Sequence, residues 1–449
     1  MSAPSKPRRL RPHARSFLAS VRALLTPAIW KQAHQARRAS RRSSRWATQP
    51  LVLTLLVMTW CCGDSQAERF ETAKGFVAVC LPKRRRPGQT VPGFQKALAR
   101  LPRRVLQAVA AGVRRRLLTL VDLRHEGWIA FGCDGSDLET PRTAELEGRL
   151  DPPLKKNGVP LVWVTALVHL RTGLLWAWRL GQGHNRERSH LLALLPTLPA
   201  AALVVADAGY NGYDLAQAIV AAGASFLIRM SAKDTLYTLE PLALEGFTAG
   251  EVFCWPQTAQ GQQRPPLRVR LIRLRGPKRR QDVWLLTDVL DAGRLSVAQA
   301  GQYYRWRWEN EGLFRTYKRT MAKVKLMSRT VRLVHREAEG ALLALQLLLA
   351  QGVRALPPRR DASGPRRCSP RKVLLVLREV IGGKLDARRG PQFGQRLAQA
   401  VREQRSRTSS KVKRVWPRKY KHKAPKPPKF LTLTEAQKAL LTKLLTQTA

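Results

Sequence analysis

Apolar residues in the first quarter of the chain recur at the spacing of helices. Phe17–Trp30, Leu51–Cys62 and Phe94–Leu118 follow the helical repeat, and Pro102 is expected to interrupt the third segment. The run at Leu51–Cys62 is about a dozen residues long, short of the roughly 20 that span a bilayer, so we expect a buried helix there. This part of the chain therefore predicts a helical domain.

The pattern then changes to continuous apolar runs and to an alternation of period two, which are typical of strands. A short helix is expected at Leu215–Ala222. The predicted strands are Gly127–Cys133, Leu161–His169, Leu174–Leu180, Ala202–Ala206 and Ser225–Arg229. Strands in this order, with helical segments between them, favour a mixed α/β sheet.

The segment between Leu236 and Val289 is β-rich, with strands expected in PLRVRLIRLRG and DVWLLTDV. Helices are predicted again at Glu337–Leu356, Arg371–Ile381 and Leu433–Leu445. These patterns predict three parts: a basic helical N-terminal region at 1–118, an α/β core at 119–355 with a β-rich insertion at about 236–289, and a helical and basic C-terminal region at 356–449.

The net charge of the chain indicates the kind of partner that it binds. The 449 residues include 81 Lys and Arg against 30 Asp and Glu, a formal charge of +51. Such an excess repels itself unless a polyanion accompanies it, so nucleic acid is the expected partner. Residues 1–62 and 404–429 contain no acid, and the second stretch is expected to be a basic tail that holds phosphates non-specifically. A merely solvated charge run is an equal alternative for the basic N-terminal stretch.

Cysteines and nucleotide motifs narrow the class of protein further. Six cysteines show neither a CxxC pair nor metal-ligand spacing with the eight histidines, which favours reduced thiols in a cytoplasmic protein. The chain has no GxxxxGK[ST] or GxGxxG motif, so nothing supports nucleotide hydrolysis.

Two aspartates are predicted at the ends of buried strands. Asp134 follows the strand GWIAFGC and begins DGS, and Asp207 follows LVVA and begins DAGY. The alternative role for either residue is to cap the turn that follows, which Asp does well. Because acids are scarce in this chain, two at matched strand ends are candidate catalytic groups.

A third acid lies in the segment Tyr303–Met321, which predicts a helix. Tyr304, Arg307, Glu311 and Lys318 stand at offsets of 0, 3, 7 and 14, close to one stripe of a helix with 3.6 residues per turn. A basic surface helix with an ordinary Arg–Glu pair is the alternative. Three carboxylates brought together would raise one another's pKa, and two Mg²⁺ ions would neutralise them while keeping sites for phosphate.

These residues carry a resemblance. DGS at Asp134, DAGY at Asp207 and the spacing Y-x2-R-x3-E-x6-K from Tyr304 to Lys318 resemble the signature of DDE transposases of the insertion-sequence-four family. The resemblance spans about residues 127–352, including the β-rich insertion before the glutamate.

The resemblance implies an RNase H-like core that binds two Mg²⁺ ions, with Mn²⁺ as an alternative, through Asp134, Asp207 and Glu311. Tyr304, Arg307 and Lys318 would contact the DNA. Members of the family cut at transposon ends, often through a hairpin, join 3′-hydroxyls to target DNA, and work as dimers on paired ends. A bacterial protein of the cytoplasm, associated with the nucleoid and not with membranes, is expected.

Other residues compete for these roles. Asp137 stands three residues beyond the first aspartate, and Glu309 stands two positions, roughly 200° around a helix, from the predicted glutamate. His184 and His190 are expected in a polar loop and not as metal ligands. Trp284 of the insertion is a candidate for stacking on a flipped base.

The sequence thus predicts a cut-and-paste DNA transposase. The alternatives are a domesticated nuclease without strand transfer and a non-catalytic basic protein that packages nucleic acid. Cys133, beside the first aspartate, is expected to pack on the opposite side of the sheet.

Overall fold

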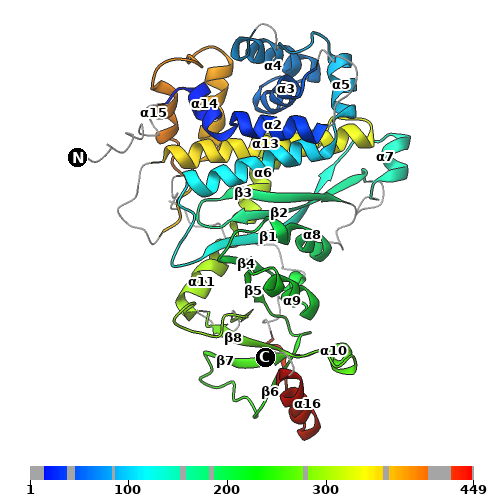
Figure 1. Ribbon diagram of the computed structural model, residues 1–449, viewed down its shortest axis with the longest axis vertical. Coiled ribbons are helices and arrows are strands. Elements are labelled where there is room, and N and C mark those ends of the chain that lie inside the picture. The colour runs from blue at the N-terminus through cyan, green and yellow to red at the C-terminus, as the bar shows by residue number, and fades with distance from the viewer. Residues whose placement is uncertain are drawn as a thin grey trace, which may run out of the picture. The chain divides into compact units, whose positions relative to one another are not determined.

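The computed structural model describes residues 15–37, 46–82, 86–151, 158–181, 187–276, 282–356, 364–402 and 426–446. Their contacts define two compact units, each assembled from separate stretches of chain (Figure 1). Unit 1 comprises Met1–Leu123, Gly135–Arg186 and Glu309–Glu403, and unit 2 comprises Arg124–Asp134, Glu187–Trp308 and Gln404–Ala449. The units interleave along the sequence, whereas the predicted domains are contiguous, and the predicted domain boundaries stay a prediction.

Unit 1 begins with helices, as the apolar spacing predicts. They are α1 (Phe17–Leu24), α2 (Pro27–Arg37), α3 (Thr48–Trp60), α4 (Gln66–Cys80), α5 (Val91–Arg100) and α6 (Arg103–Leu120). Pro27 begins α2, where its fixed φ suits the first helical position, and Pro102 separates α5 from α6. The helix predicted from Leu51 is α3, and it is buried almost throughout. The helix α4 was not predicted, because its apolar positions form no clear stripe.

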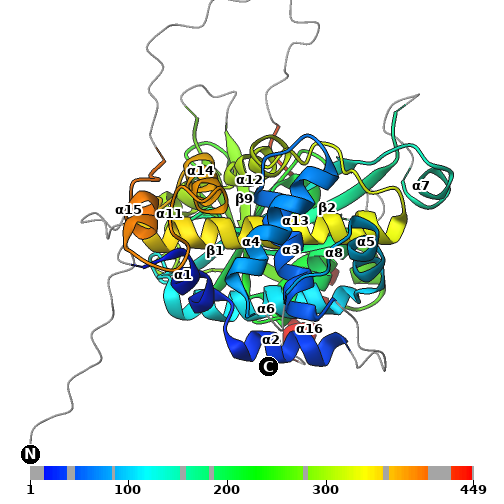
Figure 2. The same cartoon turned by 90° about the horizontal axis from the view of Figure 1, so that it is seen from above.

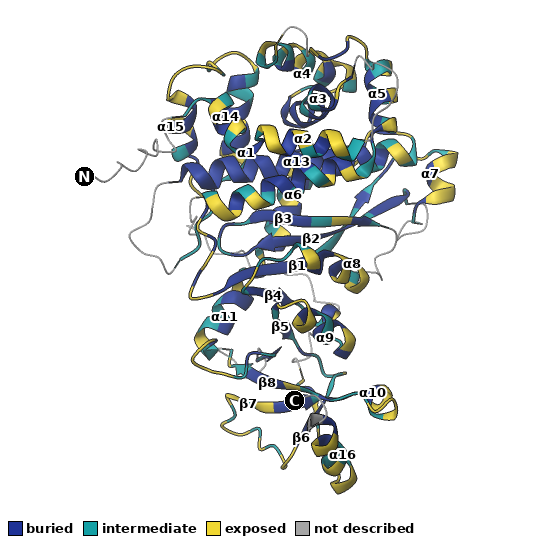
Figure 3. Cartoon of the chain, in the orientation of Figure 1, coloured by how far each residue is buried: buried dark blue, intermediate teal, exposed yellow. Residues whose placement is uncertain are grey.

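The long helix α13 (Val331–Ala355) is the centre of unit 1. It contacts α3, α5 and α6, and Figures 2 and 3 show it running across the helical layer with most of its length buried. The indole of Trp60 on α3 donates to the carbonyl of Ala344 at 3.2 Å. Gly340 permits this close approach, because a Cβ there would collide with Leu55 of α3. The helices α14 (Pro370–Ile381) and α15 (Gln392–Ala398) complete the layer.

Unit 1 also contains the antiparallel hairpin of β2 (Leu161–His169) and β3 (Leu174–Gly181), in which both predicted strands are confirmed. The helix α13 packs on β3, where the amide of Gln346 donates to the carbonyls of Leu175 and Trp176. The short helix α7 (Ala144–Arg149) follows the strand β1 (Ile129–Glu139).

The sheet of unit 2 is mixed. Its strand order is β10-β6-β7-β8-β9-β5-β4-β1. The neighbours β1, β4 and β5 are parallel, whereas β5, β9, β8, β7 and β6 each run antiparallel to the next strand in that series. The strands are β1 (Ile129–Glu139), β4 (Ala202–Ala206), β5 (Ser225–Arg229), β6 (Thr235–Thr238), β7 (Ala249–Cys254), β8 (Leu267–Leu274), β9 (Val283–Thr287) and β10 (Lys429–Thr432). The mixed α/β class and the β-rich insertion are therefore confirmed.

The helices of unit 2 flank this sheet. They are α8 (Glu187–Leu194), the 3₁₀ turns η4 (Leu195–Thr197) and η5 (Ala208–Tyr210), α9 (Tyr213–Ala221), α10 (Gln257–Gly261), α11 (Val297–Trp306) and α16 (Glu435–Thr446). The predicted C-terminal helix corresponds to α16, whereas β10, which pairs parallel with β6, was missed. Most of the predicted basic tail, residues 403–425, lies outside the described residues.

All six cysteines are free thiols. Within the described ranges, no helix combines the length and the apolar character that crossing a membrane requires.

Candidate active site

The register of two parallel strands brings the predicted aspartates together. Gly132 of β1 pairs with Val205 of β4, so two residues further on Asp134 stands beside Asp207. Adjacent strands lie about 4.8 Å apart, which places both carboxyl groups at one end of this strand pair. The sequence predicted the two aspartates at matched strand ends, and the parallel pairing of the strands comes from the structure.

The local setting of the two aspartates differs. Asp207 follows β4 directly, as predicted, and its Oδ1 accepts from the Gly209 amide at 2.9 Å, so it also caps the turn. The prediction that Asp134 closes its strand is wrong, because β1 continues to Glu139. The continuation has hydrogen-bonding partners: the Glu139 carbonyl accepts from the amide of Leu326 at 2.8 Å.

A third acid, Glu187, belongs to this cluster and was not predicted. It opens α8, and its pKa is raised to about 7 by burial and by the negative charges of Asp134 and Asp207, with a hydrogen bond from Tyr210 acting in the opposite direction. The signal in the sequence was weak: Glu187 is an acid at the start of a helix between the two aspartates. The raised pKa of Glu187 indicates that negative charge is concentrated in this cluster.

This pKa gives a prediction for the metal-free protein. A carboxyl whose folded pKa exceeds its unfolded pKa destabilises the fold as the pH rises from about 4.5 to about 7. Glu187→Gln should therefore raise the free energy of unfolding at pH 8 by about 1–2 kcal/mol, a value discounted for solvent screening. The gain should largely disappear at pH 5. Urea unfolding at both pH values measures it, with exposed Glu245→Gln as the control; equal gains at both pH values would contradict the prediction.

Two neighbours complete the surroundings of the cluster. Cys133 is 1% exposed and packs in the core, as expected, and burial raises the pKa of its thiol well above the usual range. Burial also raises the pKa of Tyr210, and the neighbouring Cys133 and Glu187 act in the same direction. Tyr210 therefore stays neutral at physiological pH beside the acids.

The predicted continuous helix from Tyr303 to Met321 is wrong. The helix α11 ends at Trp306, α12 (Glu309–Arg315) starts after a break, and η7 (Thr316–Thr320) is a π-helix. The 3.6-residue spacing does not continue across a break or through a π-turn, so the argument for a single stripe from Tyr304 to Lys318 fails. Glu311 is exposed in the first turn of α12. Glu311 lies in unit 1 and the two aspartates lie in unit 2, and their grouping stays a prediction.

Tyr304 and Arg307 form an aromatic and cationic stack with Trp308. The guanidinium carbon of Arg307 lies 5.6 Å from the Tyr304 ring centroid and 5.2 Å from that of Trp308. Tyr304 and Arg307 are buried, whereas Trp308 is 58% exposed. The Nε of Arg307 is buried and, within the described part of the chain, has no hydrogen-bond partner.

The two rival acids are both engaged by cations. Asp137 accepts from the Nζ of Lys318 at 3.0 Å, so this predicted DNA-binding lysine has an ion pair in the free protein. Glu309 pairs with Arg367 at 2.8 Å and with Arg402 at 2.6 Å. Both acids thus have a structural explanation that does not involve metal.

Other candidates have different surroundings from those expected. Trp284 is 4% exposed, stacked on Phe247 and covered by the guanidinium of Arg273, so it is not presented to a flipped base in this conformation. His190 is buried on α8, and His184 lies outside the described residues. No group of three or more His, Cys, Asp and Glu side chains is arranged to hold a metal ion in the parts that the structure describes.

Comparison with known proteins gives the class of this site. Residues 133–347 match the family model described as the transposase DDE domain. This segment of the chain is similar to the transposase DDE domain. Asp134, Asp207 and Glu311 all fall within the matched residues of this DDE domain.

Two further comparisons accompany this match. The chain is similar to the piggyBac transposase in a synaptic complex with hairpin DNA, with 12% sequence identity, 90% of each chain covered and a TM-score of 0.43. No curated protein matches the chain.

Proposed function

We propose that the protein is a DNA transposase of the insertion-sequence-four type. It cuts DNA at the ends of its element and joins the freed 3′-hydroxyls to target DNA. The observation that carries this proposal is the register of β1 on β4, which, continued two residues beyond Gly132 and Val205, sets Asp134 beside Asp207 inside the segment that matches the DDE domain. Glu311 of α12 is the proposed third acid.

The proposed cofactor is a pair of Mg²⁺ ions, with Mn²⁺ as the alternative. The fit rests on the donors: Asp134 and Asp207 offer hard oxygen ligands, and the raised pKa of Glu187 reports negative charge that a divalent cation would offset. Glu311 would complete the set. When bound, such ions activate a water or a 3′-hydroxyl and stabilise the leaving oxygen.

The chain's own cations would bind and orient the DNA. The formal charge of +51 favours a polyanion. We propose that Tyr304 and Arg307 hold the DNA end and that Lys318 exchanges Asp137 for a phosphate. Double-stranded DNA, as element ends and as target, is the proposed partner of a homodimer in the cytoplasm of a bacterium.

The test is an end-cleavage assay with the full chain and DNA that carries the inverted repeats flanking its gene. The expected result is Mg²⁺-dependent release of ends with 3′-hydroxyls, followed by their joining to a plasmid, and no reaction in EDTA. Cleavage without joining would indicate a nuclease. Binding without cleavage in Mg²⁺ or Mn²⁺ would indicate a packaging protein and would overturn the proposal.

Arg307→Ala should weaken binding to the element end and make its salt dependence shallower. Loss of one phosphate contact lowers the slope of log K against log salt by about 1. Arg307→Lys keeps the charge and should keep the slope while losing the planar stack with Tyr304 and Trp308. Fluorescence anisotropy between low and high salt measures both variants, and an unchanged slope in Arg307→Ala would count against a phosphate contact.

A further inference from the structure

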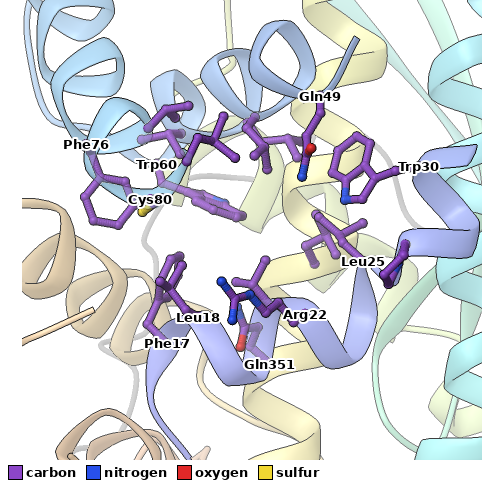
Figure 4. A pocket seen from close by; sticks show the side chains of 18 of the residues that line it. Phe17, Leu18, Arg22, Leu25, Trp30, Gln49, Trp60, Phe76, Cys80 and Gln351 are labelled. Atoms are coloured by element: carbon purple, nitrogen blue, oxygen red, sulfur yellow. The ribbon is translucent and has the colours of Figure 1, made fainter. Parts of the chain in front are cut away.

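An apolar cavity lies within the helical layer of unit 1, and none of the residues that line it has a part in the proposed reaction. It has a volume of about 270 Å³ and is bounded by α1, α2, α3, α4 and α13 (Figure 4). Since a water molecule occupies about 30 Å³ in the liquid, the cavity has room for roughly nine non-hydrogen atoms. Its wall is mainly aromatic and aliphatic, and includes Phe17, Trp30, Leu56, Trp60, Phe76 and Leu347.

Three side chains in this wall, Arg22, Gln49 and Gln351, carry amide or guanidinium groups, and two of them bear on the choice of ligand. Gln351 of α13 is 1% exposed, and its Oε1 accepts from the hydroxyl of Ser20 at 2.5 Å. Its Nε2 is buried and, in the described parts of the chain, has no hydrogen-bond partner. Buried amide donors without a partner are rare in native proteins, so this atom needs an explanation. A water would find few other polar partners in so apolar a wall.

The second polar group is Arg22 of α1. It is exposed and lines the same cavity, and Figure 4 shows its side chain on the side of the cavity where Gln351 also lies. Its charge reaches into the cavity region, since it lowers the pKa of the lining Cys80, which burial nevertheless raises to about 11. A neutral amide donor and a guanidinium beside an apolar chamber form an acceptor site for a carboxylate with an apolar tail.

We propose that this cavity binds a linear monocarboxylate of about six to eight carbons, a length set by its volume. The tail packs among the aromatic rings. The carboxylate accepts from the Nε2 of Gln351 and pairs with Arg22. Because such a ligand touches α1, α3, α4 and α13, it ties the N-terminal helices to the central helix of unit 1. This inference is independent of the proposed function.

The test uses sodium octanoate with the full chain, by calorimetric titration and by thermal unfolding. We expect 1:1 binding and a rise of about 3–6 °C in the unfolding temperature at saturation. Sodium acetate, which has no tail, should not bind. 1-Octanol, which has no charge, should bind at least about tenfold more weakly because the charge-assisted hydrogen bonds are lost.

Two variants separate this site from adsorption to a basic surface. Gln351→Glu keeps the acceptor for the Ser20 hydroxyl but repels a carboxylate. It should weaken the binding of octanoate at least about tenfold and leave the binding of octanol unchanged. Leu53→Trp, at a partly exposed wall position, fills the cavity and should abolish binding of both. The wild-type comparison of octanoate with octanol decides the matter if a variant does not fold. Absence of binding, several equivalents bound, or equal binding by wild type and Leu53→Trp would overturn the proposal.

Discussion

Asp207→Asn is expected to lower Mg²⁺-dependent cleavage of the element end by at least about a thousandfold, because a metal-bound carboxylate supplies several kcal/mol of charge stabilisation and each 1.4 kcal/mol is a factor of ten. Asp134→Asn should have the same effect, since its carboxylate stands opposite that of Asp207 across β1 and β4. Binding of end DNA should be preserved in both variants, because the cations that hold the phosphates are unchanged. The measurements are single-turnover cleavage and DNA binding in Ca²⁺.

The matched control for these variants is Asp214→Asn. Asp214 is 80% exposed in a surface ion pair with Arg264, and the substitution removes the same charge seven residues beyond Asp207. Its cleavage rate should remain within about threefold of wild type, because exposed ion pairs contribute little. Equal cleavage by all three variants and wild type would refute the assignment of the aspartates.

Glu311 is tested against its neighbour. Glu311→Gln should abolish cleavage and leave the folded protein as stable as wild type, because the side chain is exposed. Glu309→Gln should do the reverse: it removes ion pairs with Arg367 and Arg402, so it should lower stability and keep cleavage. If Glu309→Gln is inactive and Glu311→Gln is active, Glu309 is the third acid.

Glu337→Ala is expected to lower the free energy of unfolding by about 3–5 kcal/mol, the usual cost of leaving a buried charge without its partner. Glu337 lies in the first turns of α13, where it accepts from the Nζ of Lys323 at 2.8 Å and from the amides of Met327 and Ser328, both at 2.9 Å. Its removal leaves the Lys323 ammonium, 7% exposed, without its acid and frees two loop amides. Urea unfolding at pH 7 measures the loss.

The pH dependence of this pair has a definite sign. Burial would raise the pKa of Glu337, but the charge and hydrogen bond of Lys323 and the bonds from Ser328 outweigh it, so the pKa is lowered. The stabilisation is therefore complete above the unfolded pKa of about 4.5 and is lost as the pH falls through the lower folded pKa. The difference between wild type and Glu337→Ala should shrink over that acid range.

Two comparisons bracket the size of the effect. Lys323→Met combined with Glu337→Met should cost less than the sum of the single substitutions, because an apolar pair leaves no buried charge. Glu147→Ala, in an exposed pair with Arg142, should cost less than about 1 kcal/mol. A loss in Glu337→Ala no larger than this would show that the pair contributes only as a surface pair does.

Several elements of this fold could be predicted from the sequence because their signals are local. The hairpin β2–β3, the buried helix α3 and the interruption at Pro102 follow from the spacing of apolar residues and from the chemistry of proline. The helix α4 has no clear apolar stripe, and β10 is a short strand after a long basic stretch, so both escaped prediction. Short elements depend on their partners more than on their own residues.

The sequence by itself determined which groups are available for chemistry. These are the candidate acids Asp134, Asp207 and Glu311 in a chain with few acids, and a large excess of cations that favours DNA binding. Only the tertiary structure decided which of these groups share an environment. The register of β1 on β4 brings the two aspartates side by side, the start of α8 brings Glu187 near them, and ion pairs engage the rival acids Asp137 and Glu309. The physical reason is that hydrophobic periodicity is a property of residues close together in the sequence. Strand register and ion pairing join residues that the sequence separates by tens to hundreds of positions.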